Sequence, residues 1–201
     1  MPRKVSPTEA VGPRLEPDAR RAHLLAVGGT VFGSKAYDDV QIDHIAKEAG
    51  VSRGLLYHYF PNKRAFFAAI IQGGYDEILE VTRPDPKLSP PEQLQAGLMA
   101  YLDYVEGQPH MYRAIFRSAA SLEQSVQDVV NRNLDLQAKR ILAALGGASE
   151  PHSLPYLAVR AWLAFLIQAV LDWLDHGARG DRQKLIDVCV GALGGAVGAA
   201  L

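Results

Sequence analysis

Cysteine is almost absent from this 201-residue chain, in which Cys189 is the only one. A single cysteine excludes an internal disulfide framework and a zinc site built from cysteines. The six histidines nowhere show the HExxH spacing of a helical zinc site, so no metal is expected. No nucleophile paired with a base and no glycine-rich phosphate loop is recognisable. An enzyme is therefore the least favoured class, and no cofactor is predicted.

Long hydrophobic runs are lacking as well. The closest approach to a membrane span is the stretch 185–201, which is short, rich in glycine and alanine, and contains Asp187. The N-terminal residues carry charges and prolines but no apolar core of a secretory signal. We therefore expect a cytoplasmic protein without a membrane partner.

The chain has no strong excess of charge of either sign, its formal net charge being −1. The two ends nevertheless differ. Residues 1–65 hold ten Lys and Arg against seven Asp and Glu, whereas residues 66–201 hold eleven against fifteen. A mildly basic front and an acidic back would let the N-terminal part approach a polyanion.

Apolar residues, 48% of the chain, follow a helical period and never a strand period over a useful length. Four prolines in residues 1–17 predict a flexible arm, and a helix is expected to begin at Pro17–Asp18. A proline-rich stretch from Pro84 to Pro91 precedes the helices expected at 91–107, 110–118, 121–145, 154–176 and 181–199. The prediction is an all-α fold. It has an N-terminal three-helix helix-turn-helix domain at 18–65, whose last helix starts at 62 and leads into the next domain. That domain, at 66–201, is a helical dimerisation and ligand-binding domain.

Two short helical patterns surround a glycine in the N-terminal domain. The first, residues 41–49, places Ile42, Ile45, Ala46 and Ala49 on one face. Gly50 suits the left-handed conformation that ends a helix, and Ser52 is a good N-cap for the next one. Pro61 ends that second helix near Phe60. This is the skeleton of a helix-turn-helix, whose second helix enters the major groove of DNA.

The run from Gln41 to Ile70 closely resembles the DNA-binding signature of the TetR-type repressor family. The resemblance of motif covers roughly residues 18–71, and beyond it only the architecture is similar. It implies a homodimer that binds palindromic operator DNA, an interface formed by the last two helices, and a small-molecule effector. The matching positions are Ile45-Ala46, Ala49-Gly50-Val51-Ser52, Gly54, Leu56-Tyr57-His58-Tyr59-Phe60 and Lys63.

The predicted DNA contacts follow from side-chain chemistry. Ser52 and the free amides beside it can face a phosphate, and Gly54 lets the backbone approach the sugar-phosphate chain. Arg53 is the candidate for a guanine contact. Hydrogen bonds or charge at the phosphates are predicted for Tyr57, His58 and Lys63, backbone contact for Gln41 by resemblance, and a thymine methyl or simple packing for Leu55. His58 and Lys63 could equally be ordinary exposed residues, whereas Tyr59 and Phe60 favour the core.

Two sets of residues are predicted in the second domain. The helices 154–176 and 185–201 are apolar around much of their circumference and need cover, which a partner subunit would supply. Aromatic side chains with a few polar tips suit a hydrophobic or aromatic effector, although most aromatics at helical spacing belong to a core. The dimer candidates are Trp162, Leu166, Val170, Trp173, Val188, Gly191 and Gly195, and the effector candidates are Tyr101, Tyr104, His110, Tyr112, Phe116, Trp162, Phe165 and Gln168.

The sequence thus predicts a DNA-binding transcriptional regulator, a repressor released from its operator by a small hydrophobic or aromatic effector. The alternative is a helical interaction protein whose helix-turn-helix is only a scaffold. That alternative predicts no salt-dependent DNA binding and no loss when Tyr57 or Lys63 is changed.

Overall fold

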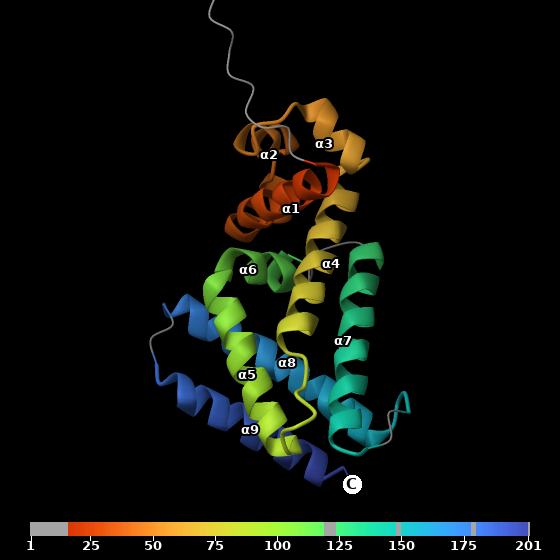
Figure 1. Ribbon diagram of the computed structural model, residues 1–201, viewed down its shortest axis with the longest axis vertical. Coiled ribbons are helices and arrows are strands. Elements are labelled where there is room, and N and C mark those ends of the chain that lie inside the picture. Colours follow the sequence, from red (N-terminus) through yellow and green to blue (C-terminus); the bar gives the residue numbers. More distant parts are fainter. Residues whose placement is uncertain (1–15, 119–123, 148–149, 178–179, 201) are drawn as a thin grey trace, which may run out of the picture.

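The computed structural model describes residues 16–118, 124–147, 150–177 and 180–200. Within these ranges the regular structure is all α-helical, as predicted, with one short 3-10 helix, η1, at Tyr37–Asp39. The helices form a small N-terminal unit above a larger helical domain (Figure 1). Their bounds are α1 Pro17–Ser34, α2 Ile42–Glu48, α3 Arg53–Tyr59, α4 Lys63–Val81, α5 Pro90–Gly107, α6 Pro109–Ser118, α7 Gln124–Ala144, α8 Leu154–Asp175 and α9 Arg182–Gly198.

The ends of the N-terminal helices are set by local residues, which is why the sequence located them well. Gly50 has φ 65°, the left-handed conformation that the turn requires. The Ser52 hydroxyl accepts a hydrogen bond from the amide of Leu55 at 3.1 Å, and the Asn62 side chain accepts one from the amide of Ala65 at 2.8 Å. The predicted Ser52 cap is therefore confirmed, and Asn62 caps the helix that was expected to start at 62.

The first four helices share one apolar core. Phe66 and Phe67 of α4 are fully buried and pack against Phe32 of α1, with ring centroids 6.2 and 4.7 Å away. Ile45 of α2 and Leu56 of α3 are also fully buried. These contacts fix the two short helices to the longer ones. The predicted arm at 1–17 lies outside the described residues except for its last two positions, and Pro17 is the first residue of α1.

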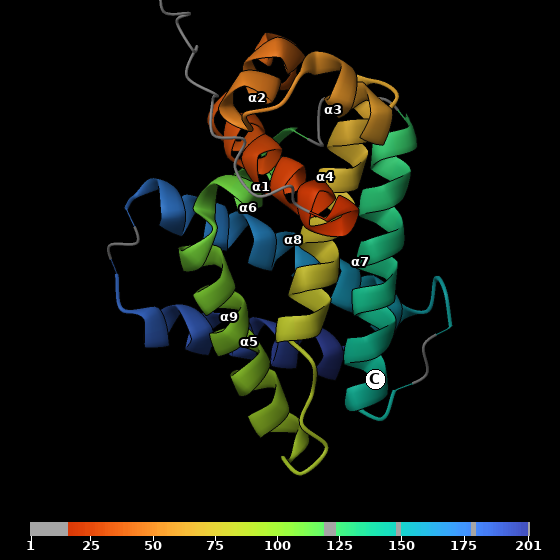
Figure 2. The same ribbon diagram turned by 45° about the horizontal axis from the view of Figure 1, so that its top comes forward.

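The helical domain is built around α8, which crosses behind α4, α5 and α7 (Figure 2). It is the one described helix that is long and apolar enough to cross a membrane, so the stretch 185–201 was the wrong place to look for the most apolar segment. Trp162, Leu166 and Val170 are all buried, and a core helix of a folded domain passes the same test.

The remaining boundaries agree with the predicted ones to within a few residues. The helix expected at 121–145 begins at Gln124 in the described part of the chain, and residues 119–123 lie outside that part.

Two arginines hold helices of the larger domain together. Arg113 of α6 contacts the end of α8 by donating to the carbonyl of Leu174 at 3.2 Å and pairing with Asp175 at 3.4 Å. Arg182 holds the start of α9 to α5 through Asp103 at 2.6 Å.

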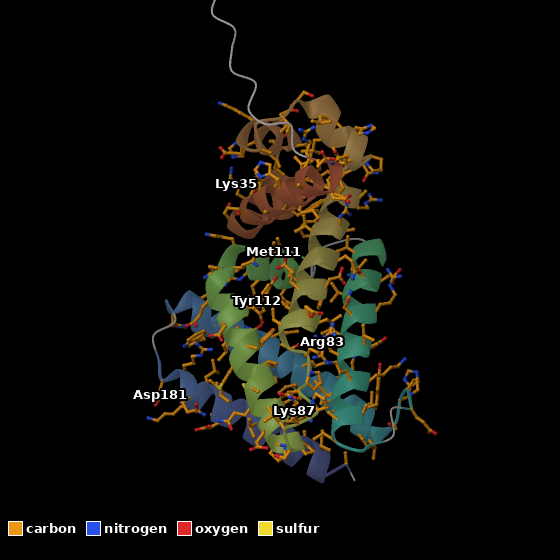
Figure 3. The ribbon with its side chains drawn as sticks, in the orientation of Figure 1. Lys35, Arg83, Lys87, Met111, Tyr112 and Asp181 are labelled. Atoms are coloured by element: carbon orange, nitrogen blue, oxygen red, sulfur yellow. The ribbon has the colours of Figure 1, made fainter. Side chains whose placement is uncertain are left out.

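The N-terminal unit is joined to the helical domain by a shared helix and by a packing contact. The shared helix is α4, which continues past the predicted boundary at 65–66 and belongs to both parts. The packing contact is that of α1 on α6, where Met111 lies directly beneath α1 (Figure 3). Here Gly29 faces the Met111 side chain and Gly33 faces the backbone of His110, so closely that neither glycine leaves room for a side chain.

Candidate nucleic-acid interface and ligand cavity

The start of α3 presents an open surface. Ser52, Arg53 and Gly54 are exposed, and a Cβ added at Gly54 would meet only the Ser52 hydroxyl, 4.0 Å away. The first amides of a helix lack partners within it and carry the positive end of the helix dipole. This surface can therefore accept a phosphate at close range.

Arg53 is held in place before any DNA is bound. Its guanidinium pairs with Asp43 of α2 at 3.0 Å and lies over the ring of Tyr57, 5.4 Å from the centroid. Both partners of the ion pair are mostly exposed, at 62% and 64%, so the pair adds little to stability. Its effect is to orient the guanidinium on the outer side of α2 and α3.

Lys63 is oriented in a similar way at the start of α4. Its Nζ donates to the carbonyl of Asp38 at 3.4 Å and lies over the ring of Tyr37, 4.4 Å from the centroid. His58 is exposed on α3, while Leu55 and Tyr57 are half-buried. Of the predicted contact residues, Ser52 is the N-cap of α3, and Lys63 is the first residue of α4. The residues on α3 itself are Arg53, Gly54, Leu55, Tyr57 and His58. Gln41 is the N-cap of α2, where its side chain makes no capping bond.

His23 belongs to this region although the sequence analysis gave it no role. Its Nε2 lies 3.2 Å from the carbonyl of Ala49, at the end of α2. A contact between residues 26 positions apart fixes the helix-turn-helix to α1. No local pattern marks such a residue, since it depends on how the helices cross.

A cavity of about 120 Å³ lies inside the helical domain, bounded by α4, α5, α7 and α8 with single residues from α6 and α9. Its lining is overwhelmingly apolar. The polar exceptions are Tyr75, Thr82, Gln93, Tyr101, Gln137, Arg140 and the indole of Trp162, and the remainder comprises Ile78, Pro84, Pro90, Leu94, Gly97, Leu98, Phe116, Leu134, Ile141, Ala144, Leu145, Leu163, Leu166, Ile167 and Leu193.

The cavity has a closed end and an open end. Tyr75 and Tyr101, at the closed end, are buried, and the ring of Tyr75 meets that of Phe116 edge-on at 5.6 Å. At the other end Pro90 and Leu145 are exposed. The open end lies near the connection between α4 and α5, where Figure 3 labels Arg83 and Lys87 in the lower half of the view. A ligand would therefore enter near that connection and extend toward α6.

Three of the predicted effector residues, Tyr101, Phe116 and Trp162, line this cavity. Tyr112 lies directly behind it, its hydroxyl 2.6 Å from that of Tyr101. The other four lie outside this cavity: Tyr104 points to the carbonyl of Gly74, and His110, Phe165 and Gln168 are exposed. Conversely, the sequence analysis missed the lining residues of α4 and α7. For α4 the available signal was the helical spacing of Tyr75, Ile78 and Thr82.

The dimer candidates also divide into two groups. Val188, Gly191 and Gly195 are exposed along one side of α9. Trp162, Leu166 and Val170 instead face the chain's own core, and the Trp162 indole donates to the carbonyl of Cys189 at 2.8 Å. Trp173 is half-buried. The outer side of α8 consists of other residues, with Leu154, Leu157 and Phe165 exposed at 70%, 48% and 41%.

Two family models match the chain. The model of bacterial regulatory proteins of the tetR family matches residues 24–70, which contain the helix-turn-helix. The model of the tetracyclin repressor-like C-terminal domain matches residues 90–192, just over half of the chain. The chain belongs to the TetR family. It is accordingly a DNA-binding transcriptional regulator that acts on operator DNA, and the prediction drawn from the motif is confirmed.

Relatives within the family resemble the chain over most of its length. The HTH-type transcriptional activator FasR of Mycolicibacterium smegmatis is 26% identical over 180 residues, which cover 88% of this chain and 82% of that protein. A TetR-family regulator from Streptomyces coelicolor has a similar structure, with a TM-score of 0.78, 27% identity, and 92% and 83% coverage of the two chains. A TetR-like regulator from Rhodococcus sp. RHA1 has a TM-score of 0.75, 26% identity, and 92% and 100% coverage.

Proposed function

We propose that this TetR-family regulator is a cytoplasmic homodimeric repressor. It binds a palindromic operator and is released when a small, mainly apolar molecule occupies the cavity. The observation that carries the proposal is the course of α4. Its first residue, Lys63, belongs to the proposed reading surface, which we define as Ser52, Arg53, Gly54, Leu55, Tyr57, His58 and Lys63. At the other end of α4, Tyr75, Ile78 and the C-cap residue Thr82 form part of the cavity wall.

The reading surface is suited to DNA. Arg53 is oriented for a base edge, while Lys63 and the capped start of α3 are placed for phosphates. A single recognition helix gives limited affinity for DNA. A specific complex therefore needs two helix-turn-helix units, here called readers, related by a two-fold axis.

The exposed sides of α8 and α9 supply the dimer surface. Val188 is 56% exposed, and a Cβ added at Gly191, Gly194, Gly195 or Gly198 would meet nothing within 4 Å in the same chain. The exposed side of α8 is apolar, and the exposed side of α9 carries glycines that have no side chains. A second copy of the chain can therefore pack closely against both helices. Phe165, first assigned to the effector, is placed in this interface instead.

Release requires that the ligand bind two states of the protein with different affinity. A ligand that pushes Tyr75 or Ile78 would tilt α4, and α6 would carry the movement to α1 through Met111. Successive major grooves lie about 34–36 Å apart, so a small tilt of both readers spoils their register.

The test is footprinting of the purified protein on DNA flanking its own gene, with and without compounds that fill the cavity. A protected palindrome that loses protection on ligand addition supports the proposal. A footprint that no cavity-binding compound alters would refute release by ligand, and no salt-dependent protection at all would favour the interaction-protein alternative.

Arg53→Ala and Lys63→Ala are expected to weaken DNA binding in different ways. Loss of Lys63 removes one phosphate contact, so affinity falls on all sequences and the slope of log affinity against log salt drops by about 1. Loss of Arg53 costs about 1–3 kcal/mol and also relaxes sequence preference at one position. Fluorescence anisotropy on matched and mismatched duplexes measures both. Lys139→Ala, an exposed cation on α7, is the control, and identical behaviour of the two reader variants would contradict the assigned roles.

A further inference from the structure

We propose that the cavity takes an elongated, mainly apolar molecule whose leading end carries a neutral oxygen, such as an alcohol or a ketone, which accepts a hydrogen bond from the hydroxyl of Tyr75. The inference rests on the proposed function in that it concerns the same cavity. It is nevertheless a statement about binding, and it holds whether or not binding releases DNA.

Tyr75 carries the first observation. Its side chain is 2% exposed and lines the closed end of the cavity, yet its hydroxyl has no hydrogen-bond partner in the described part of the chain. Burying a hydroxyl without a partner is costly, and such groups are rare in folded proteins. The neighbouring phenols of Tyr101, Tyr104 and Tyr112 all have partners. The missing partner of Tyr75 is therefore expected to come from the ligand.

The direction of the neighbouring hydrogen bonds defines the rest of the closed end. Tyr112 donates to the carbonyl of Ile167 at 3.4 Å, which uses its only proton. In the 2.6 Å contact between Tyr101 and Tyr112, Tyr101 must then be the donor. The closed end therefore offers a free proton on Tyr75 and free lone pairs on Tyr101, and a ligand hydroxyl can use both.

The charge of the lining makes a neutral group the better match. Among the lining residues Arg140 is the only cation, and it lies at the other end of the cavity. There it donates to the carbonyl of Leu79 at 2.7 Å and to that of Thr82, so two of its donors already close the end of α4. In the described part of the chain, the one cation that acts electrostatically on Tyr75, Arg160, is outside the lining and already pairs with Asp135 at 3.4 Å. A carboxylate at Tyr75 would therefore be buried without a free cation in the lining, which is strongly unfavourable.

The walls fix the body of the ligand. Tyr75 and Thr82 are seven residues apart on α4, which corresponds to about 10 Å along the helix axis. Between the two ends the walls are hydrocarbon, from Leu98 on α5, Leu134 on α7 and Leu163 on α8. The molecule is thus a chain or a narrow ring system that is polar at its inner tip.

The experiment compares 1-octanol, octane and octanoate as probes for the full-length protein and two variants. Tryptophan fluorescence reports binding, because one of the two tryptophans, Trp162, lines the cavity and the other, Trp173, does not. Melting curves report stability. Tyr75→Phe removes the unpartnered hydroxyl. Tyr104→Phe, which removes a buried hydroxyl outside the cavity, is the matched control.

We expect wild-type protein to prefer 1-octanol over both other probes, and Tyr75→Phe to bind it about three- to tenfold more weakly, the worth of one hydrogen bond. Octane affinity should not fall. Ligand-free Tyr75→Phe should melt at a higher temperature than wild type, because an unpaired polar group has gone, whereas Tyr104→Phe should melt lower and bind 1-octanol as wild type does.

Equal 1-octanol affinity in wild type and Tyr75→Phe would overturn the inference, as would tighter binding of octanoate, which would place the polar group at the outer end. If Tyr75→Phe binds 1-octanol more weakly as expected but no probe alters the footprint, the inference stands and the proposal of release by ligand fails. If DNA binding and release are found with ligands that ignore Tyr75, the proposed function stands and the inference fails.

Discussion

Gly195→Arg is expected to convert the protein into a monomer and to lower its affinity for operator DNA by about 100-fold or more. Gly195 is exposed on α9, and a side chain there meets nothing within 4 Å of its own chain. Arginine is also the better helix former, so the folded chain should lose no stability. Only a second copy packed against α9 gives the substitution a cost.

The size of the effect follows from bivalent binding. Once one reader of a dimer is bound, the other finds its half-site at an effective concentration set by the connection between them, which strengthens binding by about 10²–10⁴. A monomer forfeits that gain, although its reader surface is intact. Residual binding to a single half-site should keep its salt dependence, because Lys63 and the start of α3 are unchanged.

Analytical ultracentrifugation gives the oligomeric state, and anisotropy titration on one duplex gives the affinity. Gly107→Arg is the matched control, since Gly107 is the exposed last residue of α5 and likewise faces no neighbour within 4 Å. A Gly195→Arg protein that remained dimeric would exclude this face of α9 as the interface. Circular dichroism checks that both variants remain helical.

The parts of the fold that local chemistry determines were predictable. Gly50, Ser52 and Asn62 act on amides and carbonyls within a few residues, so the turn and the helix starts could be placed from the sequence. The proposed reading surface consists of residues close together in sequence, on α3 and at the start of α4, so its members could be predicted from local pattern as well.

The cavity and the proposed dimer face were harder to predict, because they depend on which side of a helix turns inward. Helix α8 is apolar on both sides, so spacing alone could not decide that Trp162 is buried and Phe165 is exposed. The cavity residues of α4 and α7 come from segments more than 50 positions apart, which only the packing brings together. Tyr75 is conspicuous only once its hydroxyl is seen to have no partner.

Gly33→Ala is expected to separate α1 from α6 and to weaken operator binding from a position that touches neither DNA nor ligand. A Cβ at Gly33 would overlap the backbone carbonyl of His110 and come within 2.7 Å of its Cα. Because backbone atoms cannot rotate away, the two helices must move apart. Overpacking of this kind costs about 1–3 kcal/mol of unfolding free energy, which for a chain of this length lowers Tm by roughly 2–12 °C.

Two other glycines grade the effect. At Gly29 the atoms met belong to the flexible end of the Met111 side chain, whose Sδ would lie 2.8 Å from the new Cβ, so Gly29→Ala should cost less. At Gly73, within α4, nothing lies within 4 Å, and Gly73→Ala should stabilise the protein by up to about 1 kcal/mol. Melting curves are expected to give the lowest Tm for Gly33→Ala, a higher one for Gly29→Ala and the highest for Gly73→Ala.

Operator affinity distinguishes a coupling element from a merely structural contact. If α6 sets the angle of the reader through α1, Gly33→Ala should lower affinity by about 5- to 150-fold, the usual range of a coupling between sites, at temperatures where the variant is fully folded. It should also reduce any further loss caused by ligand, because the readers are already displaced. Unchanged affinity in a destabilised Gly33→Ala protein would show that the packing of α1 on α6 holds the fold together without transmitting a signal, and α4 would then be left as the route between cavity and DNA.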